Sequence, residues 1–157
     1  MMPVDNGVYL YVDGLQDPGN LGALARVAEA FAVTAVALAP GSVHPNHPRS
    51  LRASAGSLLR MDVIIGTKAA DLASRLAAVN PTWLALAPRD GVPLGAVKLG
   101  GAMVLVVGAE GPGLSEEILS RNPLRVTIPL AGQVESLNST VAAAIVLHAM
   151  GVPGSRP

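Results

Sequence analysis

Cysteine is absent from this 157-residue sequence, and aromatic residues are nearly absent. Without cysteine the chain has no disulfide framework and no thiolate metal site, which is typical of an intracellular protein. The aromatic side chains, Tyr9, Tyr11, Phe31 and Trp83, are too few for a base-stacking platform of the single-strand-binding type.

Charge is scarce as well, and it is balanced. Charged residues make up 14% of the sequence and the formal net charge is zero, so no overall basic field indicates a nucleic-acid-binding protein. Three scattered histidines, His44, His47 and His148, predict no catalytic metal site. The sequence has no apolar run long enough to span a bilayer and no signal-like start, so we expect a cytoplasmic protein with no membrane partner.

Hydrophobic residues make up half of the sequence, and a chain of this length is long enough to bury one core. Short apolar segments alternate with helical patterns, which predicts an α/β fold with a mostly parallel six-stranded sheet and helices on both faces. The predicted strands are residues 8–12, 33–39, 61–66, 83–87, 103–107 and 124–130. Residues 92–101 are expected to form a loop with at most one short extended piece. No linker divides the chain, so we expect a single domain over residues 1–157.

Two glycine-containing turns follow apolar segments, in VLVVGAEGPGL (104–114) and IPLAGQVESLNSTVAAAI (128–145). Ligands of α/β proteins bind beyond the carboxyl ends of the strands, and glycines let a ligand approach the main chain closely. The phosphate-loop patterns are missing, and Glu110 places an anion in the first turn. A cofactor with positive charge and nucleoside edges therefore suits this turn better than a phosphate. A tight strand-to-helix turn with no ligand is the alternative.

Asn20 stands where an N-cap belongs, at the start of a helical pattern that continues to Phe31. Arg26 lies inside this pattern, beside its apolar stripe. Three further arginines, Arg49, Arg52 and Arg60, lie in or near a second predicted helix, where they form either a local basic patch or a solvated face.

The segment DGLQDPGNLGALARVAEAF (13–31) resembles motif one of the SpoU-type, or TrmH-type, RNA 2′-O-ribose methyltransferases. VVGAEGPGL (106–114) resembles their motif two and residues 128–145 their motif three, in the family's order and over nearly the whole chain. RASAGSLLRMDV (52–63) is further similar to the branch that modifies ribosomal RNA and confers antibiotic resistance. The resemblance implies methyl transfer from S-adenosylmethionine to a ribose 2′-hydroxyl, with rRNA as the expected substrate and tRNA as the alternative.

The resemblance also implies an architecture. It predicts a deep trefoil knot at the C-terminal end of the sheet and a homodimer formed through the knot region and the last helix. The loops of the knot are expected to hold S-adenosylmethionine. The residues that match the family's cofactor-binding positions are Leu86, Ala87, Gly108, Ile128, Leu130 and Leu137.

The same matching places five residues at the reacting centre: Asn20, Arg26, Glu110, Ser136 and Asn138. A guanidinium is effectively always protonated, so we expect Arg26 to grip the phosphate next to the target ribose rather than to act as a base. The two asparagines are expected to hold the loops and the ribose, Ser136 to bond near the sulfonium or the hydroxyl, and Glu110 to fix Arg26 or a neighbouring loop. Each residue also has a structural interpretation: Asn20, Ser136 and Asn138 as helix caps, Arg26 as a surface arginine, and Glu110 as a solvated carboxylate.

Many members of this family carry an amino-terminal domain that selects the RNA, and this sequence starts almost at its first predicted strand. It is therefore expected to be either a minimal member or a fragment. RNA binding is expected to be weak and to depend on arginines that dimerisation duplicates: Arg26, Arg49, Arg52, Arg60, Arg121 and Arg125. Two other functions remain open, a non-catalytic knotted dimeric RNA-binding module and a generic nucleotide-binding α/β protein.

Overall fold

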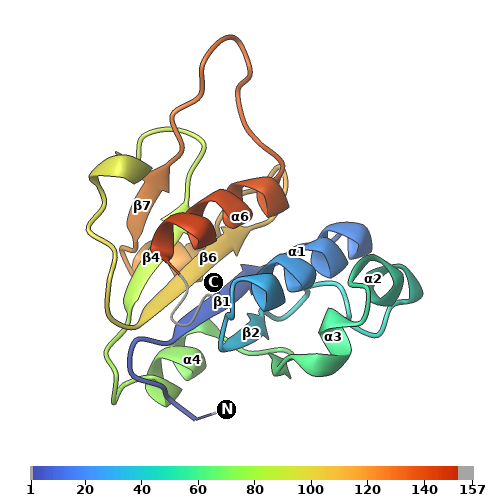
Figure 1. Ribbon diagram of the computed structural model, residues 1–157. Helices are drawn as coiled ribbons and strands as arrows, with labels where there is room; N and C mark the ends of the chain where they lie inside the picture. Colours follow the sequence, from blue (N-terminus) through green and yellow to red (C-terminus); the bar gives the residue numbers. More distant parts are fainter. Residues whose placement is uncertain (1, 152–157) are drawn as a thin grey trace.

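Two apolar segments distant in sequence form the middle of the sheet. In the computed structural model, which describes residues 2–151, β1 (Val8–Asp13) pairs in parallel with β6 (Met103–Gly108) along its whole length. Every pair of neighbouring strands in this sheet is parallel, and the strand order is β3-β2-β1-β6-β4-β7-β5 (Figure 1). The other strands are β2 (Ala35–Leu38), β3 (Val63–Ile64), β4 (Thr82–Leu86), β5 (Val92–Pro93) and β7 (Leu124–Thr127).

The sheet has seven strands, so the prediction of six was wrong. The additional strand, β5, is two residues long and pairs with β7 at the edge of the sheet. Two residues are too few to show a hydrophobic period. Proline is tolerated at a sheet edge because no neighbour needs its missing N–H, which explains how Pro93 belongs to a strand.

Helices cover both faces of the sheet, as predicted. Helix α1 (Pro18–Ala30) and helix α6 (Ser139–Met150) pack on one face. Helix α4 (Ala69–Arg75) and helix α5 (Glu116–Ser120) contribute to the core on the other face. Two short helices, α2 (Pro48–Ala53) and α3 (Ser57–Arg60), pack against α1 on the side away from α6 (Figure 1). A single 3₁₀ turn, η1 (Leu94–Ala96), follows β5.

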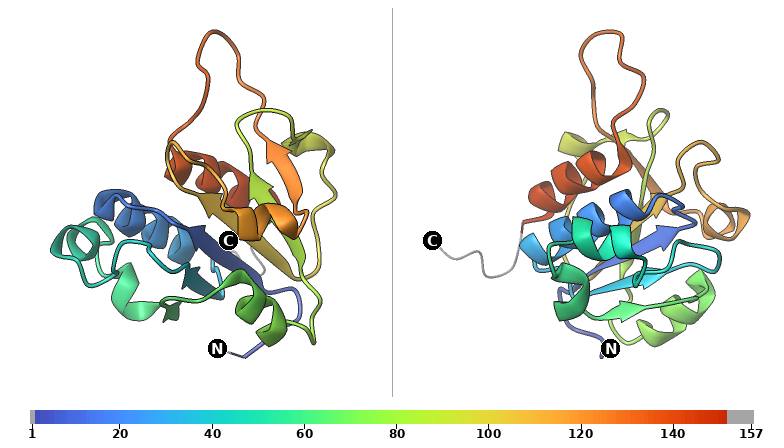
Figure 2. Two further views of the ribbon diagram at one scale, coloured as in Figure 1. Left: turned by 180° about the vertical axis from the view of Figure 1, so that it is seen from behind. Right: turned by 90° about the vertical axis from the view of Figure 1, so that its right-hand side faces the viewer.

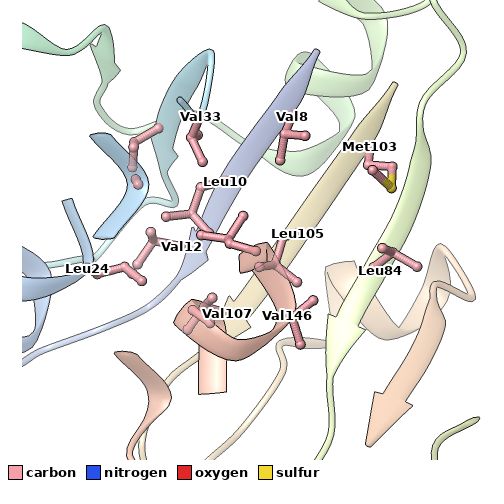
Figure 3. Close-up of a cluster of buried hydrophobic side chains, with 14 of the residues drawn as sticks. Val8, Leu10, Val12, Leu24, Val33, Leu84, Met103, Leu105, Val107 and Val146 are labelled. Carbon is pink, nitrogen blue, oxygen red and sulfur yellow. The ribbon is translucent and has the colours of Figure 1, made fainter. Parts of the chain in front are cut away.

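The alternation of side chains along β1 divides the core into two layers. Val8, Leu10 and Val12 point into the layer shared with α1 and α6, which Figure 3 shows. Tyr9 and Tyr11 point to the opposite layer and are almost completely buried there. Both sides of the central strands are covered, so these strands are apolar throughout, as buried parallel strands are.

A glycine sets the distance between α1 and α2. A Cβ built on Gly22 would lie 2.6 Å from the Cβ of Ala53 and 2.8 Å from the main-chain nitrogen of Ser54. The two helices therefore approach more closely than any larger residue at this position permits.

The carboxyl ends of the strands lie together at one edge of the sheet. Asp13 at the end of β1 is in register with Gly108 at the end of β6. The chain between β7 and α6 leaves this edge as a long loop that projects from the body of the protein (Figures 1 and 2). Among residues 2–151, no helix has the length and apolar character needed to cross a membrane.

Candidate active site

A cavity of about 640 Å³ lies where β4, β6 and β7 end. Its walls come from the loops after these three strands and from the first turn of α6. Every residue that the sequence assigned to cofactor binding lines this one cavity: Leu86, Ala87, Gly108, Ile128, Leu130 and Leu137. The cavity thus gathers segments that are far apart in the sequence.

The loop after β6 has a compact form that depends on glycine. The main chains of Ala109 and Gly113 form two reciprocal hydrogen bonds of 3.0 Å, which close the loop into a narrow turn. A Cβ on Gly108 would lie 2.7 Å from the carbonyl oxygen of Gly113. Gly111 and Gly113 have φ values of +89° and +77°, a conformation that favours glycine.

Three polar side chains meet at the rim of the cavity. Asn20 Nδ2 donates a hydrogen bond of 2.8 Å to Glu110 Oε1. Asn138 Nδ2 lies 3.2 Å from Asn20 Oδ1 and 3.4 Å from the same oxygen of Glu110. Each of these residues comes from a different motif of the sequence, so the three motifs converge at one point.

Helix capping positions the side chain of Asn138. Asn138 is the N-cap of α6, and its Oδ1 accepts a hydrogen bond of 2.9 Å from the main-chain nitrogen of Thr140. The hydroxyl of Thr140 donates in turn to the main-chain oxygen of Asn20 at 3.3 Å. Asn138 therefore caps a helix and completes the cluster at the same time.

Asn20 does not cap α1, although its position in the sequence suggested this role. Asp17 is the N-cap, and its Oδ1 accepts a hydrogen bond of 2.8 Å from the main-chain nitrogen of Asn20. Pro18 occupies the first turn, where its missing N–H costs nothing. The amide of Asn20 is therefore available for Glu110 and Asn138.

Ser136 and Arg26 lie in different places relative to this cluster. Ser136 lines the cavity and is exposed. Arg26 is exposed and does not line it. Because a helix turns about 100° per residue, Arg26 lies about 120° around α1 from Asn20. It lies instead on the side of Gly22, which faces α2. Glu110, Ser136 and Asn138 thus line the cavity, and Asn20 reaches its rim through bonds to Glu110 and Asn138. Arg26 lies outside the cavity.

The SpoU rRNA Methylase family matches residues 7–148, which is most of the chain. The chain belongs to this family. It is 34% identical over 139 residues to the 23S rRNA (guanosine(2553)-2′-O)-methyltransferase RlmP of Bacillus subtilis, a match that covers 88% of this chain and 56% of RlmP. The chain spans about half the length of the curated relatives that it matches.

Solved structures of the same kind are similar over most of the chain. The SpoU methyltransferase AviRb from Streptomyces viridochromogenes, in complex with the cofactor AdoMet, has a TM-score of 0.86 at 25% identity, covering 95% of this chain and 58% of AviRb. A structure described in connection with the 2-OH methylation of C/U34 on tRNA has a TM-score of 0.77 at 26% identity. That match covers 92% of this chain and 94% of the other.

In this SpoU family chain, one residue that supports the cavity was not predicted from the sequence. Asp13, which is 5% exposed, accepts a hydrogen bond of 2.6 Å at Oδ2 from the main-chain nitrogen of Ser115. This bond joins the end of β1 to the turn that follows the glycine loop, so Asp13 helps to hold one wall of the cavity. A lone aspartate at the end of a strand resembles an ordinary turn signal, and its partner is 102 residues away.

The six arginines proposed for RNA binding have different environments. Arg60 donates to both carboxylate oxygens of Glu29, at 2.6 and 2.7 Å. These bonds, with a further bond from Ser57, lower the pKa of Glu29 to about 2. The guanidinium of Arg121 lies 4.4 Å from the centre of the Trp83 ring.

Of the six arginines, Arg26 and Arg52 are exposed and form neither an ion pair nor a side-chain hydrogen bond within residues 2–151. Arg49 lies 3.6 Å from Asp17, and Arg125 donates to the main-chain oxygen of Arg89 at 3.3 Å. The described residues contain no group of three side chains arranged to hold a metal ion.

Proposed function

We propose that this chain transfers a methyl group from S-adenosylmethionine to a ribose 2′-hydroxyl of RNA. The observation that carries the proposal is the convergence of Asn20, Glu110 and Asn138 at the rim of a cavity lined by all six candidate cofactor residues. Because the proposed substrate is RNA, we also propose that the protein acts in the cytoplasm.

The residues around the cavity suit this cofactor. Its volume lies in the range of small-molecule sites, which are mostly apolar with a few polar groups. Leu86, Ile128, Leu130 and Leu137 offer an apolar slot for an adenine, and the glycine loop offers accessible main-chain groups. The solved AviRb structure, which contains AdoMet, matches this chain over nearly its full length.

The bound cofactor supplies a methyl group that is already activated, so the protein has to orient the hydroxyl and manage its proton. We assign the orientation of the ribose to Asn138, and we assign to Ser136 a hydrogen bond near the hydroxyl or the sulfonium. Glu110 accepts from both asparagines, so its role is to hold the loop after β6 against α1 and α6. Asn20 acts through these two residues as a positioning residue.

Arg26 has a separate role. It points away from the Asn20 cluster of its own chain, and a guanidinium does not act as a base at physiological pH. We therefore assign to Arg26 a bidentate grip on the phosphate next to the target ribose, which positions the nucleotide and stabilises charge.

Ribosomal RNA is the proposed substrate, because RlmP is named as a 23S rRNA methyltransferase and shares 34% of its matched residues with this chain. A tRNA substrate is the second candidate. It is favoured by the structure connected with methylation of C/U34 on tRNA, because the match covers 94% of that chain.

The proposal includes the knot and the homodimer that the family resemblance implies. An apolar strip on α6 supports dimerisation: Val141 is 48% exposed and Ile145 is 37% exposed. Burying such residues against a second copy removes apolar surface from water. We also propose that residues 1–157 contain one methyltransferase domain.

Two measurements test the function. Isothermal titration is expected to show that the chain binds S-adenosylmethionine, which separates it from a generic nucleotide-binding protein. Labelled cofactor is expected to transfer its methyl group to bulk rRNA more efficiently than to bulk tRNA. Cofactor binding without transfer to either RNA would instead support the non-catalytic RNA-binding module.

Arg26→Ala tests the role of Arg26 in the proposed reaction. Because Arg26 does not line the cavity, the variant is expected to bind S-adenosylmethionine as the parent does and to lose methyl transfer. Transfer at close to the parent rate would exclude the phosphate-gripping role.

A further inference from the structure

The part of the chain between Glu29 and Asp62 contains no acidic residue, although acidic and basic residues balance over the whole sequence. Its histidines and arginines are His44, His47, Arg49, Arg52 and Arg60. Of these, Arg60 is already bound through two hydrogen bonds to Glu29. The other four lie on helix α2 or in the loop that precedes it, and all four are exposed.

This loop is fixed to the segment that leads to the candidate active site. The main-chain nitrogen of Val43 donates to the oxygen of Leu15 at 2.8 Å, and Gln16 Nε2 donates to the oxygen of Gly41 at 2.7 Å. Residues 14–16 continue directly into α1 and Asn20. The loop before α2 is therefore held beside the start of α1.

The two histidines are held in defined orientations. His44 Nδ1 accepts a hydrogen bond of 3.1 Å from the main-chain nitrogen of Asn46, and His47 Nδ1 accepts one of 3.1 Å from Arg49. In a neutral imidazole, a nitrogen that accepts a hydrogen bond leaves the proton on the other nitrogen. Each exposed ring therefore presents Nε2–H as a donor, and phosphate oxygens are acceptors.

The arginines continue the same surface along α1 and α2. Arg26 follows Gly22 by one helical turn, so it lies on the side of α1 against which α2 packs. The Arg49 side chain is 62% exposed, and its pairing with Asp17 at 3.6 Å is that of a weak surface ion pair. Arg49 therefore retains donors for another anion.

We propose that His44, His47, Arg49, Arg52 and Arg26 form a strip of hydrogen-bond donors, positively charged at its three arginines, that binds the RNA backbone flanking the target ribose. This inference rests on the proposed function, since it concerns how the substrate of that reaction is held. The strip contacts phosphates and does not recognise bases. Contacts to phosphate position an RNA without reading its sequence. In a chain with zero net charge, it concentrates positive charge beside the motif that contains Asn20 and Arg26.

Arg52→Ala tests the strip, with Arg75→Ala as the matched control. Both arginines are exposed on short helices and both changes remove one charge, but Arg75 belongs to α4 on the opposite face of the sheet. RNA affinity is measured by fluorescence anisotropy on an rRNA fragment over a series of salt concentrations. Arg52→Ala is expected to weaken binding and to reduce the slope of log affinity against log salt by about 1, as the loss of one phosphate contact does.

Arg75→Ala is expected to leave both the affinity and the slope unchanged. His44→Ala provides a second variant, which removes one hydrogen-bond donor of the strip and is expected to weaken RNA binding. Equal behaviour of Arg52→Ala and Arg75→Ala, both folded by circular dichroism, overturns the proposal. Arg52→Gln replaces Arg52→Ala if the alanine variant does not fold.

Measuring S-adenosylmethionine binding distinguishes a failure of the strip from a failure of the proposed function. S-adenosylmethionine binding by all variants is expected to equal that of the parent. A parent chain that binds the cofactor and methylates RNA, with Arg52 variants indistinguishable from Arg75→Ala, refutes the strip alone. A parent chain that neither binds the cofactor nor methylates RNA refutes the proposed function.

Discussion

At the scale of single residues, the position of Asn20 depends on Asp17. Asp17 caps α1 and thereby leaves the Asn20 side chain free to bridge Glu110 and Asn138. The partners of Asn20 are 90 and 118 residues away in the sequence. A small change in this side chain is therefore transmitted to two walls of the cavity.

Asn20→Ala removes both bridges without altering the lining of the cavity. We expect the turnover number for methyl transfer to fall about 100-fold, the usual cost of misplacing a reacting group by about 1 Å. The affinity for S-adenosylmethionine is expected to change much less, because Asn20 does not line the cavity. Steady-state kinetics with titration of the cofactor measures both. An unchanged turnover number would contradict the positioning role of Asn20.

The sequence predicted three residues that the structure brings together, and it did not predict how each is held. Asn20, Glu110 and Asn138 were all selected by motif matching, and the structure brings them together. The direction of Arg26 could also be predicted from the sequence, because two residues that are six positions apart on a helix, such as Asn20 and Arg26, lie on different faces. Asp13 was missed because its partner is a main-chain nitrogen, which leaves no pattern in the sequence.

At the scale of helices and strands, the hydrophobic pattern predicted the main strands and the presence of helices on both faces. It failed where elements are very short. β5 has two residues, and α3, which begins directly after Gly56 with its φ of +90°, has four. Such elements are stabilised by contacts with their neighbours rather than by their own sequence period.

The contact between α1 and α2 leads to a stability prediction. Gly22→Ala is expected to destabilise the protein by about 1–3 kcal/mol, the usual cost of overpacking, because the new methyl group meets main-chain atoms of α2. Urea denaturation measures the change. The matched control is Gly95→Ala, where a Cβ meets nothing within 4 Å. Equal midpoints for the two variants would show that α1 and α2 are not tightly packed.

We predict that the link between α1 and α3, formed by Arg60 and Glu29, depends on pH. Hydrogen bonds from Arg60, then from Ser57, lower the pKa of Glu29 from 4.5 to about 2. Because the folded state has the lower pKa, the stabilisation is complete above pH 4.5 and is lost as the pH falls towards 2. Glu29→Gln is expected to lower the urea midpoint at neutral pH, with a difference from the parent that shrinks towards about pH 2.

Asp5→Asn is the control for this change, since the Asp5 side chain forms no hydrogen bond or ion pair within residues 2–151. Its difference from the parent is expected to stay small from neutral pH to about pH 2. A constant difference between Glu29→Gln and the parent over the same range would rule out the proposed linkage.

At the scale of the whole molecule, the exposed apolar strip of α6 predicts self-association. Val141→Glu places a charge on this strip and is expected to convert a dimer into a monomer, as measured by light scattering during gel filtration. Leu59→Glu is the matched control, because Leu59 is 76% exposed on α3, away from α6. A Val141→Glu variant with the same mass as the parent would contradict dimerisation through this helix.

At the same scale, the proposed action on RNA has to be reconciled with a chain that carries no net charge. The cavity is lined mostly by apolar residues, the polar cluster lies at its rim, and two exposed arginines without an ion pair, Arg26 and Arg52, lie on α1 and α2. Binding of the methyl donor and binding of the RNA are thereby assigned to different surfaces, which meet along α1. The composition of the whole chain averages over these surfaces, so it does not indicate the RNA substrate that we propose.

The measurement that tests the account most directly is the position of the methyl group on RNA. The chain is incubated with rRNA and labelled S-adenosylmethionine, and the RNA is then hydrolysed in alkali. Cleavage by alkali requires a free 2′-hydroxyl, so a methylated ribose protects the adjacent phosphodiester bond. We predict that the label is recovered in alkali-resistant dinucleotides. Label in mononucleotides, which indicates a methylated base, or no label in the RNA would contradict the account.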